Sequence, residues 1–316
     1  MNTKWYIAST LALVFFALLF TSVKPLFSMK MPEGNGLASV NIITKPFFQS
    51  ELVDGENYKS KNFRTPVRKW DVFDPLVLSE AVLIQSLDDG FPFLSYNTYK
   101  SWPMASLTKL LTAVAIFEDI GANEKIPISS AAVETEGESG NLRSGEVYTA
   151  RELLQIMLLA SSNDVAAAFE EYFGGKEKFA EILNSKASKM GMTGTVVYDG
   201  SGLSNSNVSS ASDLSKLIKY IAEKTPEILS WTRLQNIIVQ PTNDTTSKQI
   251  SNINPISSGQ DFLGGKTGTS PAAGENIISI FSFENRRVVV IILGSPNRAN
   301  EISSLLSWVK KAYESR

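Results

Sequence analysis

The chain has 316 residues, 43% of them hydrophobic, which is enough to bury a sizeable core in one large domain or two small ones. Its 30 basic and 32 acidic residues leave a formal charge of -2 and form no basic block, which argues against a nucleic-acid partner. The lack of cysteine and histidine excludes disulfides and argues against a catalytic transition metal, so we expect no metal and no cofactor.

The N-terminal segment, residues 1 to 23, carries an uncharged and mostly apolar run from Trp5 to Val23, between Lys4 and Lys24. As a helix this run would be about 28 Å long, close to the thickness of the hydrocarbon core of a bilayer. A cleaved signal peptide would have a shorter apolar core and a small-x-small site, and no Ala-x-Ala follows Phe20. We therefore expect a retained membrane anchor, with a cleaved signal segment as the alternative.

The following segment, residues 24 to 75, mixes proline, glycine, lysine and polar residues without a sustained period, which is typical of a tether. The pattern changes at Leu76. Residues 82 to 87, an Asp88-Asp89-Gly90 turn and residues 91 to 96 predict a β-hairpin. We therefore assign residues 76 to 316 to one folded domain.

Helical periodicity follows the hairpin. Residues 104 to 120 place apolar side chains at helical spacing, with Gly121 as a stop, so Ser106 is expected in the first turn of a buried helix. Thr149 and Glu152 have capping-box spacing ahead of a helix that ends at Ser161. Further helices are predicted over residues 163 to 174, 176 to 190 and 210 to 223.

The C-terminal part of the chain predicts antiparallel strands over residues 276 to 283 and 288 to 293, and a closing helix over residues 300 to 313. Lys266 to Gly268 would then begin, or just precede, an edge of that sheet. Strands come first and last and helices fill the middle. This order predicts an α+β fold, an antiparallel sheet with covering helices plus an all-helical subdomain.

Three short strings carry the chemistry: Ser106-Leu107-Thr108-Lys109, Ser161-Ser162-Asn163 and Lys266-Thr267-Gly268. A serine nucleophile needs a base, and without histidine or a thiolate the remaining candidate is lysine. At i, i+3 on a helix, Ser106 and Lys109 share one face. A neutral Lys109 requires a pKa about three below its usual 10.4, a difference of roughly 4 kcal/mol, which burial and a second cation such as Lys266 would favour.

Other copies of these patterns are weaker candidates. Ser307-Trp308-Val309-Lys310 lies in the closing helix with no later partner motif, and Ser95-Tyr96-Asn97 and Ser139-Gly140-Asn141 lack the flanking helices of Ser161. Residues 259 to 267 nearly match the phosphate-binding pattern Gly-x4-Gly-Lys-Thr. The first glycine comes one position too early and a strand-like segment follows, so phosphates would lack a helix N-terminus. Glu134, Glu136 and Glu138 are interpreted as a solvated loop.

Taken in order, the three strings resemble the active-site motifs of penicillin-recognising serine enzymes. Within that group the chain looks like the D-alanyl-D-alanine carboxypeptidases, or low-molecular-mass penicillin-binding proteins, over roughly residues 76 to 316. The sequence segments that carry this resemblance are Pro103-Met104-Ala105-Ser106-Leu107-Thr108-Lys109, Ala160-Ser161-Ser162-Asn163-Asp164, Asp199-Gly200-Ser201-Gly202-Leu203 and Gly265-Lys266-Thr267-Gly268-Thr269. The resemblance implies a β-lactamase/transpeptidase-like fold.

The resemblance also implies roles. Ser106 would attack the bond between two terminal D-alanines of a peptidoglycan stem peptide, with Lys109 as its base. Ser161 would relay a proton to the leaving amine, and Asn163 would position Lys109 and the substrate. The substrate-binding residues would be Lys266, Thr267, Gly268 and Thr269, the first two at the terminal carboxylate, with the amides of Ser106 and Thr269 as the oxyanion hole.

The resemblance further implies inhibition by β-lactams and a place in the bacterial cell envelope, on the extracytoplasmic side of the cytoplasmic membrane. Many relatives carry a second, β-rich domain, and its absence here would suit a DD-endopeptidase that cleaves peptide crosslinks. A class A-like β-lactamase would need Ser-Asp-Asn and a deacylating glutamate, but residues 191 to 209 contain no glutamate. A non-catalytic cell-wall sensor is the remaining alternative.

Overall fold

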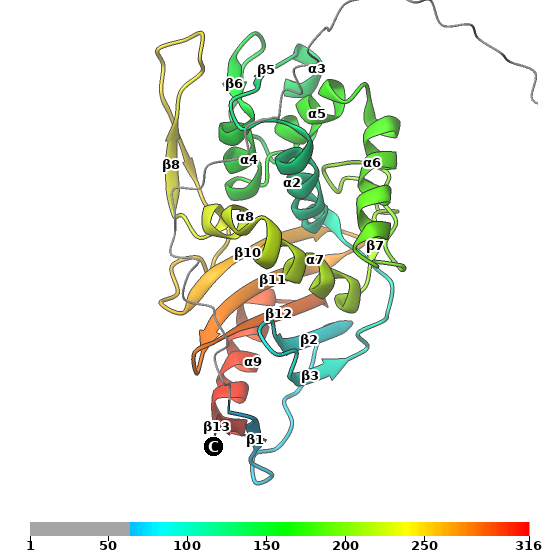
Figure 1. The fold of residues 1–316 in the computed structure, drawn as a ribbon, viewed down its shortest axis with the longest axis vertical. Helices are drawn as coiled ribbons and strands as arrows, with labels where there is room; N and C mark the ends of the chain where they lie inside the picture. The colour runs from blue at the N-terminus through cyan, green and yellow to red at the C-terminus, as the bar shows by residue number, and fades with distance from the viewer. Residues whose placement is uncertain (1–63, 316) are drawn as a thin grey trace, which may run out of the picture. The chain divides into compact units, whose positions relative to one another are not determined.

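The computed structural model of the chain describes residues 64–315 (Figure 1). The predicted anchor, residues 1 to 23, and most of the predicted tether lie outside the described residues. Within residues 64–315, every helix is too short or too polar to cross a lipid bilayer.

A five-stranded antiparallel sheet forms the lower half of the domain in Figure 1. Its strand order is β10 (Phe262–Ser270), β11 (Gly274–Phe283), β12 (Arg286–Ser295), β2 (Ala81–Ser86) and β3 (Pro92–Tyr96). The β2–β3 hairpin turns at Gly90, where φ is +75°. The predicted strands and the α+β fold class are confirmed.

Both faces of this sheet are buried. Successive side chains of a strand point to opposite sides, and in this sheet both sets are apolar. In β12, Val288, Val290 and Ile292 join one apolar cluster, while Val289, Ile291 and Leu293 join the other. Helix α9 (Arg298–Ala312) packs against the first face with its residues Ile302, Leu305 and Val309. Helices α7 (Ala211–Lys224) and α8 (Pro226–Thr232) cover the second face.

The helical subdomain lies above the sheet in Figure 1. Its helices are α2 (Thr108–Asp119), α3 (Ser130–Val133), α4 (Ala150–Leu159), α5 (Asn163–Tyr172) and α6 (Lys176–Lys189). Every side chain of α2 from Thr108 to Ile116 is buried. At the start of α4, Thr149 and Glu152 form the predicted capping box. The predicted helical subdomain is therefore present.

Four two-stranded ladders were not expected from the sequence. They are β1 (Pro66–Arg68) with β13 (Tyr313–Ser315), β4 (Trp102–Pro103) with β7 (Val208–Ser209), β5 (Lys125–Pro127) with β6 (Val147–Thr149), and β8 (Asn236–Val239) with β9 (Lys248–Ser251). The first pairs three residues of the predicted tether with the end of the described chain. The second pairs the segment before α2 with the segment before α7, the third lies between α2 and α4, and the fourth is a hairpin that follows α8.

Candidate active site

Ser106 lies in a single 3-10 turn, η2 (Ala105–Leu107), that leads directly into α2. The sequence placed it in the first turn of the helix itself, and the difference arises at Ala105, whose φ of 48° is left-handed. Such a conformation costs a non-glycine residue of order 1–3 kcal/mol. The strand β11 supports the turn, because Asn276 Nδ2 donates to the carbonyl oxygens of Pro103 at 2.8 Å and Met104 at 3.2 Å.

Lys109 directs its amine at Ser106. Its Nζ lies 3.0 Å from Ser106 Oγ, 2.7 Å from Asn163 Oδ1 and 2.6 Å from the carbonyl oxygen of Ser201. An ammonium group has three N–H donors, so these three acceptors satisfy it completely. The structure thus brings Ser106, Lys109 and Asn163 together as predicted.

Burial lowers the pKa of Lys109 from 10.5 to about 7, against carboxylates that raise it, of which Asp199 has the largest effect. The side chain is 0% exposed. A substantial fraction of the amine is therefore neutral near pH 7, the form in which it can accept the proton of a serine hydroxyl. Burial, not a second cation, is the main cause of the lowered value.

Ser161 and Asn163 lie on the turn between α4 and α5, as predicted. Ser161 is buried and has a left-handed φ of 58°, a second strained non-glycine residue in the site. Asn163 is fixed from the loop that precedes β6, since its Nδ2 donates to Glu136 O at 2.8 Å and its backbone N donates to Glu138 O at 2.7 Å. Its side-chain oxygen is thereby left to face Lys109.

Lys266 lies inside the edge strand β10, whereas the sequence placed it at the beginning of a strand or just before one. Its Nζ donates to Ser161 Oγ at 2.8 Å and to Thr267 O at 2.8 Å. Burial and then the charge of Lys109 lower the pKa of Lys266 well below its usual value, with Arg298 acting in the same direction. The structure thus brings Lys266 and Ser161 together in the site.

Gly268 brings β10 against the turn of Ser106. A Cβ at this position would lie 2.9 Å from Met104 O and 3.1 Å from Ser106 N, so a larger residue would push the strand away. Next to it, Thr269 accepts a hydrogen bond at Oγ1 from Arg298 Nη1 at 2.6 Å. Arg298, in the first turn of α9, was missed by sequence reasoning, although its cation lies at the end of the predicted carboxylate-binding strand.

The loop from Asp199 to Ser204 completes the site and supplies the Ser201 carbonyl. The buried Asp199 carboxylate accepts hydrogen bonds from four backbone N–H groups of the loop, those of Ser201, Gly202, Leu203 and Ser204, at 2.5 to 3.2 Å. In the sequence this segment was recognised only through its resemblance to the family and was assigned no role. A main-chain acceptor leaves no side-chain signature, so its contact with Lys109 could not be read from the residues.

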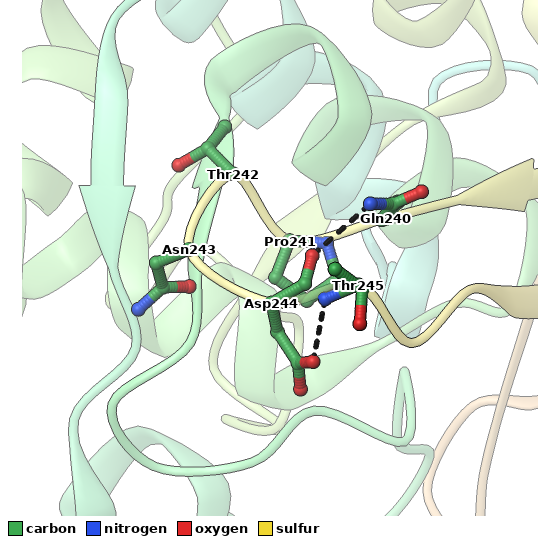
Figure 2. A pocket seen from close by; sticks show the side chains of 6 residues that line it. All are labelled: Gln240, Pro241, Thr242, Asn243, Asp244 and Thr245. Atoms are coloured by element: carbon green, nitrogen blue, oxygen red, sulfur yellow. Dashed lines mark hydrogen bonds between the residues drawn. The ribbon is translucent and has the colours of Figure 1, made fainter.

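The alternative motifs lie elsewhere in the described chain. Ser95 is exposed on β3, Ser139 Oγ donates to Asp164, and Lys310 in α9 pairs with Asp261. The near-match to a phosphate-binding pattern runs into β10, which continues to Ser270 as a strand. A shallow polar hollow of about 470 Å³ lies at the tip of the β8–β9 hairpin, residues 240–245, and contains none of the predicted site residues (Figure 2).

A serine hydroxyl beside a buried lysine, on an antiparallel sheet flanked by a helical subdomain, defines a serine peptidase of the acyl-transfer type. A family model for the D-alanyl-D-alanine carboxypeptidases matches residues 75–297, and the chain belongs to that family. The predicted fold and family are thereby confirmed.

Known proteins extend this relationship. The chain is 34% identical over 155 residues to a D-alanyl-D-alanine endopeptidase of Pseudomonas aeruginosa, covering 48% of this chain and 49% of that protein, about half of its length. It is 24% identical over 233 residues to the D-alanyl-D-alanine carboxypeptidase DacB2 of Mycobacterium tuberculosis, covering 72% and 80%. A crystal structure of a D-alanyl-D-alanine carboxypeptidase from the same organism superposes with a TM-score of 0.70 at 24% identity, covering 78% of this chain and 96% of the other.

Proposed function

We propose that the protein is a D-alanyl-D-alanine carboxypeptidase that removes the terminal D-alanine of peptidoglycan stem peptides through an acyl-enzyme on Ser106. The observation that supports this most directly is the 3.0 Å contact between Ser106 Oγ and the buried amine of Lys109. In this proposal Lys109 takes the hydroxyl proton as Oγ attacks the carbonyl carbon. The amides of Ser106 and Thr269 would stabilise the resulting oxyanion, by roughly 3 kcal/mol per donor.

The leaving D-alanine must gain a proton as the peptide bond breaks. Ser161 Oγ, which accepts a hydrogen bond from Lys266, would donate its proton to the departing amine and regain one from the protonated Lys109 amine. Lys266 and Thr267 would bind the terminal carboxylate, with Gly268 and Thr269 continuing the binding strand. A water molecule would then attack the acyl-enzyme, releasing the shortened peptide and restoring the Ser106 hydroxyl.

A DD-endopeptidase that cleaves crosslinks between stem peptides is the second candidate. Such an enzyme would cleave the same type of bond in the same site. This candidate is supported by the Pseudomonas aeruginosa relative, which is named a D-alanyl-D-alanine endopeptidase and is 34% identical. A β-lactamase is less well supported, because the loop of residues 191–209 offers no glutamate to activate a deacylating water. A sensor without turnover would not need a satisfied Lys109 amine beside Ser106.

Two further features belong to this proposal. The apolar run from Trp5 to Val23 would anchor the protein in the cytoplasmic membrane, and the domain would act on the extracytoplasmic side, where peptidoglycan lies. β-Lactams, which carry an amide bond and a carboxylate like the substrate, would acylate Ser106, and the acyl group would be released slowly.

The test has two parts. A fluorescent penicillin should label the wild-type protein and fail to label Ser106→Ala, and labelling of that variant would contradict the assignment of the nucleophile. Mass spectrometry of purified muropeptides after incubation then separates the candidates. Loss of one alanine from a pentapeptide indicates a carboxypeptidase, and conversion of crosslinked dimers to monomers indicates an endopeptidase.

A further inference from the structure

The backbone carbonyl that accepts a hydrogen bond from Lys109 is fixed by contacts to the residue before it. Ser201 O accepts from Lys109 Nζ at 2.6 Å, and the preceding residue is Gly200. Gly200 O accepts from Thr112 Oγ1 at 2.7 Å, and Gly200 N donates to Glu170 Oε1 at 2.6 Å. Both backbone polar groups of Gly200 are therefore bound by side chains from the helical subdomain.

The two helices that bind Gly200 are those that carry groups contacting the amine. Helix α2 supplies Lys109 and, one turn later, Thr112; helix α5 supplies Asn163 and, two turns later, Glu170. Residues at i, i+3 or i, i+7 share one face of a helix. Each helix thus reaches the Lys109 amine with one residue and the Gly200 peptide with another.

Within residues 64–315, no other side chain of α5 hydrogen-bonds to this peptide. Asp199 binds N–H groups within its own loop, from Ser201 to Ser204, and so fixes the internal shape of the loop. Behind Gly200, a Cβ would lie 2.8 Å from Cε1 of the buried Phe179 ring, so the peptide is confined from that side. The contact from Glu170 sets the distance between the loop and the helix that carries Asn163.

We propose that Glu170 is a positioning residue for the base. Its carboxylate holds the Gly200–Ser201 segment so that the Ser201 carbonyl keeps Lys109 Nζ directed at Ser106 Oγ. This inference rests on the function proposed above for Ser106 and Lys109. It assigns a role in that site to a side chain that touches neither the nucleophile nor the amine.

Glu170 also acts through its charge. Burial raises the pKa of Glu170, the Gly200 N–H lowers it, and Asp199 raises it, while the more distant Lys176 lowers it and Glu177 raises it. The carboxylates of Asp199, Glu138, Asp164 and Glu170 act on the Lys109 amine through their charge and raise its pKa against burial. Lys109 and Lys266 each disfavour a positive charge on the other. Removing the Glu170 charge should therefore lower the pKa of Lys109.

Two substitutions separate the hydrogen bond from the charge. Glu170→Gln keeps an oxygen acceptor for Gly200 N and loses the charge, whereas Glu170→Leu loses both at similar size. We would measure the second-order rate constant for acylation of the full-length protein by a fluorescent penicillin from about pH 5 to about pH 9. Glu171→Leu is the matched control, because this neighbouring glutamate accepts a hydrogen bond from Ser129, the N-cap residue of α3, instead of contacting the loop.

Glu170→Leu should acylate at least about tenfold more slowly than wild type at every pH, because the amine is misplaced. Glu170→Gln should stay within about threefold of wild type at high pH, with the midpoint of its pH profile moved to lower pH. Glu171→Leu should match wild type in both respects.

Wild-type acylation rates in Glu170→Leu would overturn the proposal. An unshifted midpoint of the pH profile in Glu170→Gln would also overturn it. This second result can be obtained even if the leucine variant does not fold. A loss in Glu170→Gln as deep as in Glu170→Leu would overturn it too. Failure of the wild-type protein to acylate at Ser106 would instead reject the function proposed above.

Discussion

Gly202 packs against Ala105, the residue before the proposed nucleophile, with no room for a side chain between them. A Cβ on Gly202 would lie 2.0 Å from the Ala105 carbonyl oxygen and 2.9 Å from Ser106 N. The φ of Gly202, +86°, is in addition a conformation that other residues rarely adopt. The loop that provides an acceptor for Lys109 therefore also sets the position of the turn that carries Ser106.

Replacing Gly202 with alanine should slow acylation by a penicillin by about 100-fold or more, because the added methyl group must displace the 3-10 turn. Gly145→Ala is the matched control. Gly145 has the same φ of +86° but nothing within 4 Å of its Cβ position, so this variant should lose some stability and keep its acylation rate. Equal acylation rates in the two variants would contradict the steric argument.

The pH dependence of acylation should follow the Lys109 amine. With a pKa of about 7, the amine is protonated in acid and cannot take the Ser106 proton, so the rate should rise with pH around a midpoint near 7. Stopped-flow acylation with a chromogenic β-lactam measures this profile. Lys109→Arg should lose activity across the whole range, about 1000-fold at its best pH, because the guanidinium stays charged. A flat profile in the wild type would exclude Lys109 as the base.

Substrate binding should be accompanied by proton uptake at Lys266. Its pKa is lowered by burial and by Lys109, and the carboxylate of a bound peptide would raise it again. At a pH between the pKa values of Lys266 in the free and the bound protein, Ser106→Ala should therefore take up as much as about one proton on binding a peptide that ends in D-alanine. Calorimetry in two buffers with different ionisation enthalpies measures this uptake.

Two controls define that experiment. Lys266→Met, in the Ser106→Ala background, should abolish both the uptake and most of the affinity, and a ligand with a C-terminal amide should bind without uptake. Identical binding heats in the two buffers would show that Lys266 does not change its protonation state.

The buried ion pair between Glu146 and Lys248 should stabilise the hairpin β8–β9 against β6. The pair is 2.5 Å apart with side chains 6% and 11% exposed. Burial raises the pKa of Glu146, but the hydrogen bonds from Lys248, Arg143 and Tyr148 outweigh it and lower the value. Glu146→Leu should reduce the free energy of unfolding by about 3–5 kcal/mol, because it leaves the buried Lys248 cation without an opposite charge.

This loss should depend on pH in a defined direction. Because the pKa of folded Glu146 is below its usual value of 4.5, its stabilising effect is present above that pH and disappears as the pH falls through the folded value. Urea unfolding of wild type and Glu146→Leu should therefore converge in acid. The double variant Glu146→Leu/Lys248→Met should recover part of the stability at neutral pH, and a further loss would contradict the ion-pair explanation.

Much of the site could be predicted because its side chains come from elements with clear patterns. The β-branched runs of β2, β11 and β12 predict buried strands, and the helical spacing after Pro103 places Ser106 and Lys109 on one face. The strand β10 was harder to recognise, because its glycines indicate a loop by composition. The structure gives their reason: a Cβ on Gly265 would lie 2.3 Å from Ile278 O on the neighbouring strand.

Other parts could not be predicted for physical reasons. Arg298 reaches Thr269 across the fold from the start of α9, and no local spacing connects them. The strands β8 and β9 are separated by a polar stretch, residues 240 to 247, that contains no tight-turn glycine, so the hairpin has no short-range signal. The contact of Lys109 with Ser201 uses a carbonyl oxygen that every residue type possesses.

The pairing of β1 with β13 brings the two ends of the described domain side by side, at the pole of the sheet away from the helical subdomain (Figure 1). A short peptide could join residues 64 and 315, and new termini could open at the Glu284–Asn285 turn, to give a circular permutant with the same active site. Fusion partners or surface attachment at either end of this domain would likewise leave the site of Ser106 accessible to a polymer as large as the cell wall.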